Sequence, residues 1–347
     1  MGSPDHKEPI KVLFADIVHP ILNEELEKMN FTCENLADKK GQTIEELLPY
    51  YEGLIIRSKV ELDKKQLDNA KKLKFIARAG AGMESINVEY AESMGIHCIN
   101  APEGNKDAVA DHVIGMILAL FKNLHIADSE VRKGMWNREA NRGLELTGKT
   151  VGIIGYGFTG GEVGKRLKGF GVKVLAYDKY KSEFSDDYVT ETTLERIYEE
   201  ADILSLHLPL TPETEFMVDG DFFNRFKKNI YLINTSRGKV VNTAELVKCL
   251  KSGKVLGACL DVLEYESASF ERLKGLGMWT NKRGVLINNF GAWLMKIGAL
   301  QYRHPVQYLV KSKKVLLSPH IAGWSVESYK KISLILLERI KKLNLHS

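Results

Sequence analysis

The chain has 347 residues, of which 44% are apolar, and a formal net charge of +4. The length predicts two domains, and a small net charge with dispersed lysines and arginines argues against nucleic-acid binding. Four scattered cysteines without a CxxC pair argue against a disulfide framework and a zinc site, and no apolar run has membrane-spanning length, so we expect a cytoplasmic protein without a metal.

Short apolar runs alternate with amphipathic stretches between residues 10 and 100. The apolar runs read IKVLFAD, FTCENL, GLIIRS, LKFIAR and IHCIN, and the stretches between them read ILNEELEKM, TIEELLPYY, DKKQLDNAKK and VEYAESM. This β-α rhythm predicts a parallel sheet covered by helices.

A long apolar helix is expected from Asp107 to Leu124, and the β-α rhythm restarts at Thr150. Later strands read VKVLAYD, ADILSLHLPL, NIYLINTS, VLGACLDV and KKVLLSPHI. A final helix, Val326 to Leu343, is expected to return to the first unit. We therefore predict a discontinuous domain of residues 8–104 plus 324–347 and a second domain of residues 105–323.

The segment 155–160, GYGFTG, follows an apolar strand and opens a helix, and the next strand ends at Asp178. This order and spacing are those of the dinucleotide-binding fingerprint. Gly155 would make the tight turn, Gly157 would let the backbone approach the pyrophosphate, and Gly160 would let helix and strand pack closely. Asp178 would bind the adenosine ribose hydroxyls and repel a 2′-phosphate, so NAD is favoured over NADP. Lys179 could partly offset that repulsion.

Three further segments lie where predicted strands end, the edge at which open α/β sheets bind ligands. They are NTSRG at 234–238, DVLEYE at 261–266 and SPHIAGW at 318–324. An arginine such as Arg237 can clamp a carboxylate with two hydrogen bonds. A histidine such as His320 can transfer a proton near neutral pH.

With RAGAGMESIN, NAPEGNKDAVADH and HLPLTPET, these segments resemble the D-isomer-specific 2-hydroxyacid dehydrogenases, and the closest resemblance is to short phosphoglycerate dehydrogenase-like members. The resemblance implies an α/β fold with two Rossmann-like domains, one flavodoxin-like and one dinucleotide-binding, each a doubly wound parallel sheet, flanking a cleft. It also implies a homodimer formed through the NAD-binding domain, to which the helix 107–124 would contribute.

The resemblance implies a role for each segment. His320 would be the acid/base, Glu266 would hold its second ring nitrogen, and Arg237 would grip the substrate carboxylate. Residues expected to contact the cofactor are Gly155, Gly157, Phe158, Thr159, Gly160, Asp178, His207, Thr235, Ser236, Asp261, Ala322 and Gly323. Residues expected to contact the substrate are Arg57, Ser58, Arg78, Ala79, Gly80, Ala81 and Gly82, the last four through backbone amides.

Two arginines near the substrate site, Arg57 and Arg78, suit a dianionic phosphate group. Oxidation of 3-phospho-D-glycerate in serine biosynthesis is therefore the leading hypothesis. Glyoxylate or hydroxypyruvate reduction is the alternative. A different class, a non-catalytic NADH-sensing co-repressor, shares the same motifs. The segment 271–304 is longer than the resemblance leads us to expect. It is compatible with a lid, with an apolar patch for a partner, or with an insertion that has no role.

Overall fold

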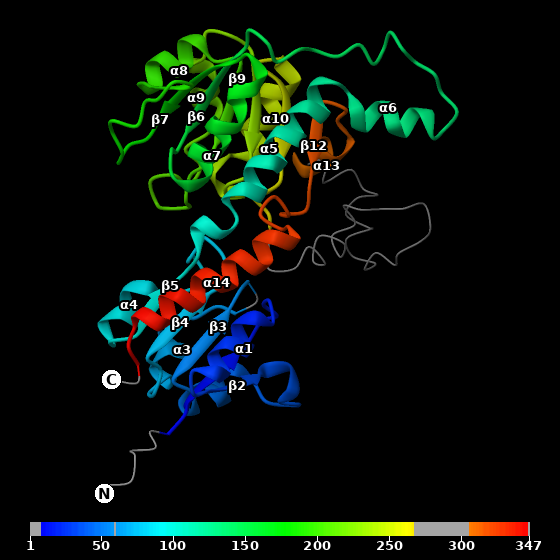
Figure 1. Cartoon of the computed structure of the whole chain (residues 1–347). Helices are drawn as coiled ribbons and strands as arrows, with labels where there is room; N and C mark the ends of the chain where they lie inside the picture. Colours follow the sequence, from blue (N-terminus) through cyan, green and yellow to red (C-terminus); the bar gives the residue numbers. More distant parts are fainter. Residues whose placement is uncertain (1–7, 59, 267–304, 346–347) are drawn as a thin grey trace, which may run out of the picture. The chain divides into compact units, whose positions relative to one another are not determined.

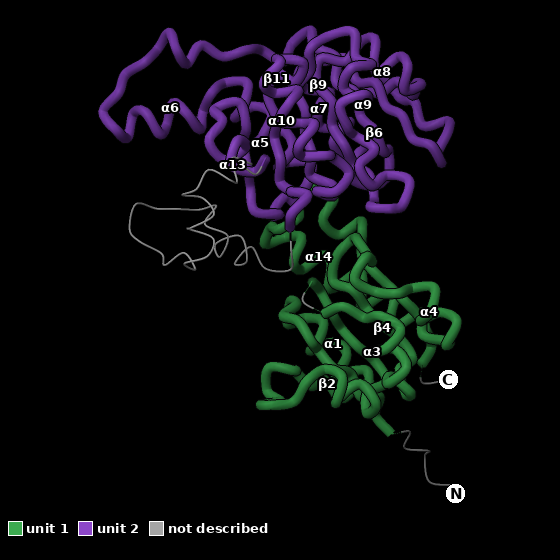
Figure 2. Tube along the Cα trace, turned by 180° about the vertical axis from the view of Figure 1, so that it is seen from behind, with its two compact units in different colours: residues 1–108, 323–347 green, residues 109–322 purple. Residues whose placement is uncertain are grey.

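The computed structural model describes residues 8–58, 60–266 and 305–345. The segment 271–304 and its three interpretations therefore lie outside the described residues. The chain divides into two compact units, Met1–Ala108 with Gly323–Ser347, and Val109–Ala322 (Figure 2). Residues 105–108 and 323, predicted for the second domain, belong to unit 1.

Unit 1 contains a five-stranded sheet in the order β2-β1-β3-β4-β5, and every strand pair is parallel. The strands are β1 Ile10–Phe14, β2 Phe31–Asn35, β3 Gly53–Ile56, β4 Phe75–Arg78 and β5 His97–Ile99. This is the flavodoxin-like order, whose switch point lies between β1 and β3. All five strands were predicted from apolar runs in the sequence. The three central strands β1, β3 and β4 are largely buried, whereas the edge strands β2 and β5 are only partly buried.

Helices cover both faces of this sheet (Figure 1). The helical segments of unit 1 are α1 Ile21–Lys28, η1 Leu36–Asp38, α2 Ile44–Leu47, η2 Leu48–Tyr50, α3 Lys64–Asn69, α4 Val88–Ser93, η3 Pro102–Gly104 and α14 Val326–Lys342. Apolar residues of α1 and α14 form one core cluster with the sheet, and those of α2, α3 and α4 form the other. The last helix thus packs in unit 1, where the sequence predicted it.

Unit 2 contains a seven-stranded parallel sheet in the order β12-β11-β10-β9-β6-β7-β8. The strands are β6 Thr150–Ile154, β7 Lys173–Tyr177, β8 Val189–Glu191, β9 Ile203–Leu206, β10 Ile230–Asn234, β11 Val255–Leu260 and β12 Val315–Leu317. Order and direction are those of a dinucleotide-binding Rossmann sheet, with its switch point between β6 and β9. The predicted α/β class is confirmed. Only β8, three residues long, was not predicted.

The helical segments of unit 2 are α5 Lys106–Phe121, which begins in unit 1, α6 Leu124–Val131, α7 Phe158–Leu167, η4 Lys168–Phe170, α8 Leu194–Glu200, α9 Gly220–Arg225, η5 Gly238–Val240, α10 Thr243–Ser252 and α13 Pro305–Lys311. Apolar residues of α5 and α7 pack on one face of the sheet, and those of α8, α9, α10 and α13 pack on the other.

The helix predicted from Asp107 to Leu124 ends early in the structure. Asn123 adopts the left-handed conformation with φ 51°, which separates α5 from α6. Asparagine tolerates this conformation better than most residues, and the apolar pattern on either side hid the break.

No described helix alone is long and apolar enough to cross a membrane, and α5 with α6 meets those criteria only as a bent pair, on length and composition.

Candidate active site in unit 2 and candidate anion site in unit 1

The glycine-rich turn joins β6 to α7 at the switch point of the unit 2 sheet. Gly155 has φ 92°, and a Cβ atom there would lie 2.3 Å from the carbonyl oxygen of His207. A Cβ atom on Gly160 would lie 2.0 Å from the carbonyl oxygen of Gly155. Both distances are far below van der Waals contact, so only glycine fits at either position.

Gly157 differs from these two glycines because a Cβ atom there would face open space, with nothing within 4 Å. It is the N-cap residue of α7, and no side chain caps the helix. The first amides of a helix have no partner within the helix, and together with the helix dipole they form an anion-binding end. The turn therefore provides space and donors for a pyrophosphate group.

Asp178 follows β7, and its carboxylate is held against the glycine turn. One oxygen accepts a hydrogen bond from the Tyr156 amide at 2.7 Å, and the other accepts one from the Tyr180 amide at 2.9 Å. Lys179, which could have offset its charge, instead forms an ion pair with Glu213. The carboxylate can accept further hydrogen bonds from ribose hydroxyls, and it opposes a 2′-phosphate.

Two buried polar atoms at the same sheet edge have no hydrogen-bond partner among the described residues. They are Nδ1 of His207, just after β9, and Oγ1 of Thr235, just after β10. The other ring nitrogen of His207 lies 2.9 Å from the Ser205 hydroxyl. Burial lowers the pKa of His207 to about 4, so the ring is neutral at physiological pH. Buried polar atoms without partners are costly, and a bound dinucleotide would satisfy them.

His320 and Glu266 form a pair after β12 and β11. Nδ1 of His320 lies 2.8 Å from Oε2 of Glu266, and Oε1 of Glu266 accepts a hydrogen bond from the Leu263 amide. The hydrogen bond with Glu266 raises the pKa of His320, although burial opposes this rise. Because Glu266 occupies Nδ1, the nitrogen left to exchange a proton is Nε2.

Asp261 holds the loop that carries His320. Its buried carboxylate accepts hydrogen bonds from the Ser318 hydroxyl at 2.5 Å and from the amides of Ile321 and Ala322 at 2.9 and 2.8 Å. Its carbonyl oxygen accepts one from the His320 amide, and His320 has the left-handed φ of 54°. A non-glycine residue in this conformation is held there by its surroundings. A direct contact of Asp261 with the cofactor stays a prediction.

The loop of Arg237 packs against the loop of Glu266. A Cβ atom on Gly238 would lie 2.0 Å from the carbonyl oxygen of Leu263, so the two backbones touch. The charge of Arg237 acts on His320, whose pKa it lowers slightly against the effect of Glu266. Ser236 is buried and bonds Asn234, the last residue of β10. The three predicted catalytic residues thus lie on neighbouring loops of one sheet edge.

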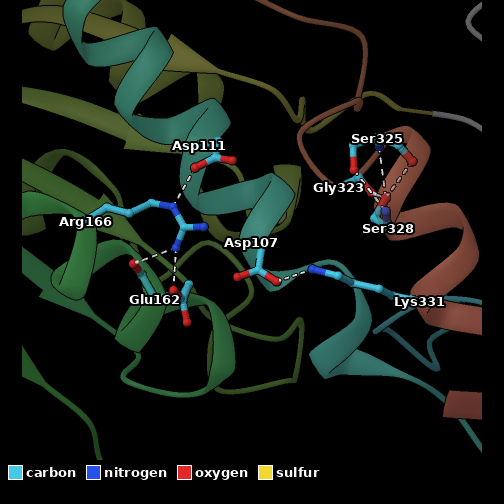
Figure 3. Close-up of polar contacts among 8 residues, drawn as sticks. All are labelled: Asp107, Asp111, Glu162, Arg166, Gly323, Ser325, Ser328 and Lys331. Atoms are coloured by element: carbon cyan, nitrogen blue, oxygen red, sulfur yellow. Dashed lines mark hydrogen bonds and ion pairs between the residues drawn. The ribbon is translucent and has the colours of Figure 1, made fainter.

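Sequence reasoning missed the supporting roles of Ser318 and His112. The Ser318 hydroxyl lies 2.9 Å from Nε2 of His112 on α5. On the same helix, Asp111 forms an ion pair with Arg166 of α7, which also pairs with Glu162 (Figure 3). These contacts tie α5 to the β12 loop and to the helix that follows the glycine turn.

The predicted substrate residues of unit 1 have different environments. The amides of Arg57 and Ser58, just after β3, donate to Oδ2 of Asp16 at 2.7 and 3.0 Å. The Arg78 guanidinium folds over Gly80. The amides of Ala79 and Gly80 donate to the carbonyls of Ile56 and Arg78, so of the four predicted amide ligands only those of Ala81 and Gly82 are still proposed.

The remaining predicted cofactor residues, Phe158, Thr159, Ala322 and Gly323, differ in their exposure to solvent. Phe158 and Thr159 open α7 and are exposed or half-buried, whereas Ala322 is buried and its amide is used by Asp261. Gly323 belongs to unit 1, where it packs against Asn105. Among the described residues, no group of three or more His, Cys, Asp or Glu side chains could hold a metal ion. The expected absence of a metal stays a prediction.

Comparison with known proteins agrees with this geometry. The NAD-binding-domain model of the D-isomer specific 2-hydroxyacid dehydrogenases matches residues 114–322, and their catalytic-domain model matches residues 12–202. The chain is similar to D-3-phosphoglycerate dehydrogenase of Archaeoglobus fulgidus, with 32% identity over 95% of this chain and 56% of that protein. The chain spans about half the length of the curated phosphoglycerate dehydrogenases it matches.

Two other relatives match over nearly their whole length. Hydroxypyruvate reductase of Thermotoga maritima is 30% identical, with 91% of each chain covered. The crystal structure of D-lactate dehydrogenase from Aquifex aeolicus, complexed with NAD and lactic acid, superposes with a TM-score of 0.76 at 28% identity, covering 96% of this chain and 95% of that one. The predictions of the family and of NAD are confirmed. The chain belongs to the D-isomer-specific 2-hydroxyacid dehydrogenase family, and residues 114–322 match the NAD-binding domain of that family.

Proposed function

We propose that the protein interconverts 3-phospho-D-glycerate and 3-phosphohydroxypyruvate, a step of serine biosynthesis. The observation that carries this choice is Arg57. Its guanidinium is half-buried after β3, and no described group accepts a hydrogen bond from it or pairs with it. A half-buried cation without an anionic partner among the described residues favours a substrate with a second anionic group. Similarity to the Archaeoglobus fulgidus enzyme supports the same choice.

The residues of unit 2 suit proton transfer to the substrate oxygen. When bound, NAD supplies the site that accepts or donates the hydride. In the oxidation, Nε2 of His320 takes the proton of the C2 hydroxyl, and in the reduction it returns a proton to the C2 oxygen. Glu266 stabilises the charged ring and fixes its orientation through Nδ1. Arg237 pairs with the C1 carboxylate, and Asp261 keeps His320 in its left-handed conformation.

Residues that would hold the dinucleotide lie along one sheet edge. The α7 amides would bind the pyrophosphate, Asp178 the ribose, and the buried polar atoms of His207 and Thr235 the remaining polar groups. Because Asp178 opposes a 2′-phosphate, NADP should bind more weakly.

Hydroxypyruvate reduction is the second candidate, because the Thermotoga maritima relative matches over 91% of both chains. The two are separated by following NADH absorbance with phosphohydroxypyruvate and with hydroxypyruvate at matched concentrations. A kcat/KM at least about tenfold higher for the phosphorylated acid, roughly the effect of one charged hydrogen bond, supports the first proposal. Equal or reversed values favour the second.

A homodimer formed through unit 2 is also proposed. The apolar residues of α5 are mostly buried in their own unit, but α6 and the segment after it extend away from the sheet (Figure 1). This arm exposes large apolar side chains at Leu124, Val131, Met135, Trp136 and Leu144. Exposed apolar groups of this kind often mark subunit contacts. Light scattering after size-exclusion chromatography tests the dimer, since Trp136→Asp should shift a dimer toward the monomer.

Four unpaired cysteines suit a reducing compartment, and we propose that the protein is cytoplasmic.

A further inference from the structure

Arg57 occupies the switch point of the unit 1 sheet. It follows β3, and Asp16, which holds its amide, follows β1. In sheets of this order, the carboxyl ends of the two strands at the switch point form the usual ligand-binding edge. The buried carboxylate of Asp16 accepts the amides of both Arg57 and Ser58, so the backbone that carries the guanidinium is held in place.

The guanidinium of Arg57 lies over the indole ring of Trp324. Its Cζ atom is 3.3 Å from the ring centroid of Trp324, a residue for which no separate role was predicted. Tyr329, one turn into α14, lies 6.1 Å from the Trp324 ring and 5.3 Å from the His19 ring, measured between centroids. Trp324 itself is 55% exposed, so it does not serve mainly to fill the core.

The backbone on both sides of Trp324 is fixed. Ser325 and Ser328 form a capping box at the start of α14, and the Ser328 hydroxyl also donates to the Gly323 carbonyl at 2.8 Å (Figure 3). In the same unit, Lys331 of α14 pairs with Asp107 at 2.8 Å. The indole therefore starts from a rigid helix end, which limits the positions that the stacked guanidinium can take.

Stacking has a specific consequence for the donors of Arg57. An indole covers one face of the guanidinium. The guanidinium N–H groups point outward in the guanidinium plane and stay available as hydrogen-bond donors. Burial lowers the pKa of Arg57, and the charge of nearby Asp16 partly offsets this effect. A dianionic group brought to those donors would supply the missing charge.

We propose that Trp324 is a positioning residue that holds Arg57 to receive a second anionic group of the substrate, a phosphoryl or a second carboxylate group. The proposal rests on the function proposed above, since it assumes that Arg57 meets substrate. It extends that function by assigning substrate preference to an aromatic side chain at the start of α14.

The test compares Trp324→Leu, Trp324→Phe and wild type, with NADH and either phosphohydroxypyruvate or hydroxypyruvate. Loss of the stack should raise the KM for the phosphorylated acid about tenfold, from the strength of a partly desolvated cation–π contact. The kcat/KM for hydroxypyruvate should fall by less than about threefold, and Trp324→Phe should recover most of the loss because it retains an aromatic face. Tyr50→Leu, which removes an exposed aromatic side chain before β3 at the opposite sheet edge, serves as the control.

A double-mutant cycle with Arg57→Ala shows whether Trp324 acts through Arg57. In the Arg57→Ala background, Trp324→Leu should have no further effect on the KM for the phosphorylated acid. Additive losses, or equal losses with both substrates, would overturn the proposal.

A second measurement, the inhibition of hydroxypyruvate reduction by inorganic phosphate, tests the positioning role independently of the proposed function. If wild type does not prefer the phosphorylated acid but Trp324→Leu still weakens phosphate inhibition, the proposed function fails and the positioning role stands. If phosphate inhibition is the same in both proteins, the positioning role fails.

Discussion

The exchange Glu266→Gln tests the pair that carries the proposed chemistry. Glutamine keeps the size of the side chain and an oxygen for Nδ1 of His320, but it removes the negative charge. Hydrogen bonds to charged groups contribute about 1.5–3 kcal/mol to stability and neutral ones about 0.5–1.5 kcal/mol. The His320 side chain is 53% exposed, so solvent screening reduces the difference, and we expect about 1 to 1.4 kcal/mol. The pKa of His320 should therefore fall.

The sign of the effect follows from the direction of the pKa. Glu266 raises the pKa of His320, so the ring stays protonated at pH values above its ordinary pKa of 6.5. Reduction of the 2-oxo acid requires this protonated ring, and its kcat/KM declines as pH rises through the pKa. In Glu266→Gln that decline should begin at a lower pH than in wild type. The same pair stabilises the folded protein fully below about pH 6.5, and this contribution is lost as pH rises through the folded-state pKa.

The assay is the pH profile of kcat/KM for the reduction, measured by NADH absorbance in wild type, Glu266→Gln and Glu264→Gln. Glu264 is a matched control, because its carboxylate accepts the Thr243 amide at 2.9 Å at the start of α10, and no contact with His320 is found among the described residues. Glu264→Gln should keep the wild-type midpoint. If the midpoints of all three proteins coincide while circular dichroism shows them folded, Glu266 does not set the protonation of His320.

Further predictions concern the dinucleotide edge. Gly157→Ala should weaken NADH binding by about tenfold or more in calorimetric titration with no loss of thermal stability, because its Cβ meets only open space, whereas Gly160→Ala should destabilise the fold itself. An equal loss of stability in both variants would contradict this reading. Asp178→Ala should reduce the preference for NADH over NADPH by about tenfold, from the loss of like-charge repulsion, and an unchanged kcat/KM ratio would refute it. Burial lowers the pKa of His207 to about 4, so this residue should cost up to about 3 kcal/mol of stability as pH falls from 6.5 to 4. The stability of His207→Asn, measured by urea unfolding, should lack this pH-dependent loss. Identical pH dependence of stability in wild type and His207→Asn would argue against the effect.

Local spacing explains why the glycine turn could be predicted from the sequence. Gly155, Gly157, Gly160 and Asp178 lie within one strand–turn–helix–strand unit, and each has the environment that the spacing implies. The steric reasons are also local, since a Cβ atom on residue 160 would collide with the backbone of Gly155. Such motifs can be predicted because the chain has little freedom over so short a distance.

Contacts between distant loops could not be derived in this way. Nothing in the letters DVLEYE distinguishes Glu264 from Glu266, and only the resemblance favoured the second. In the structure, Glu264 binds the first amide of α10 and Glu266 binds His320. The choice depends on how the β11 loop bends toward the β12 loop, which is a property of the folded sheet. The strand-end rule could have identified Asp16, because it closes the first apolar run, but the stack of Arg57 on Trp324 had no signal in the sequence.

Under the proposed function, reaction chemistry and substrate preference belong to different parts of this chain. The proposed catalytic residues His320, Glu266 and Arg237 lie with Asp178 on the carboxyl edge of the unit 2 sheet. The half-buried cation that favours a second anionic group lies at the switch point of the unit 1 sheet. Proteins with the same pair and glycine turn can therefore differ in substrate through unit 1 alone. It follows that substitutions around Arg57 should change the ratio of kcat/KM values between acids, whereas substitutions around His320 should lower all of them together.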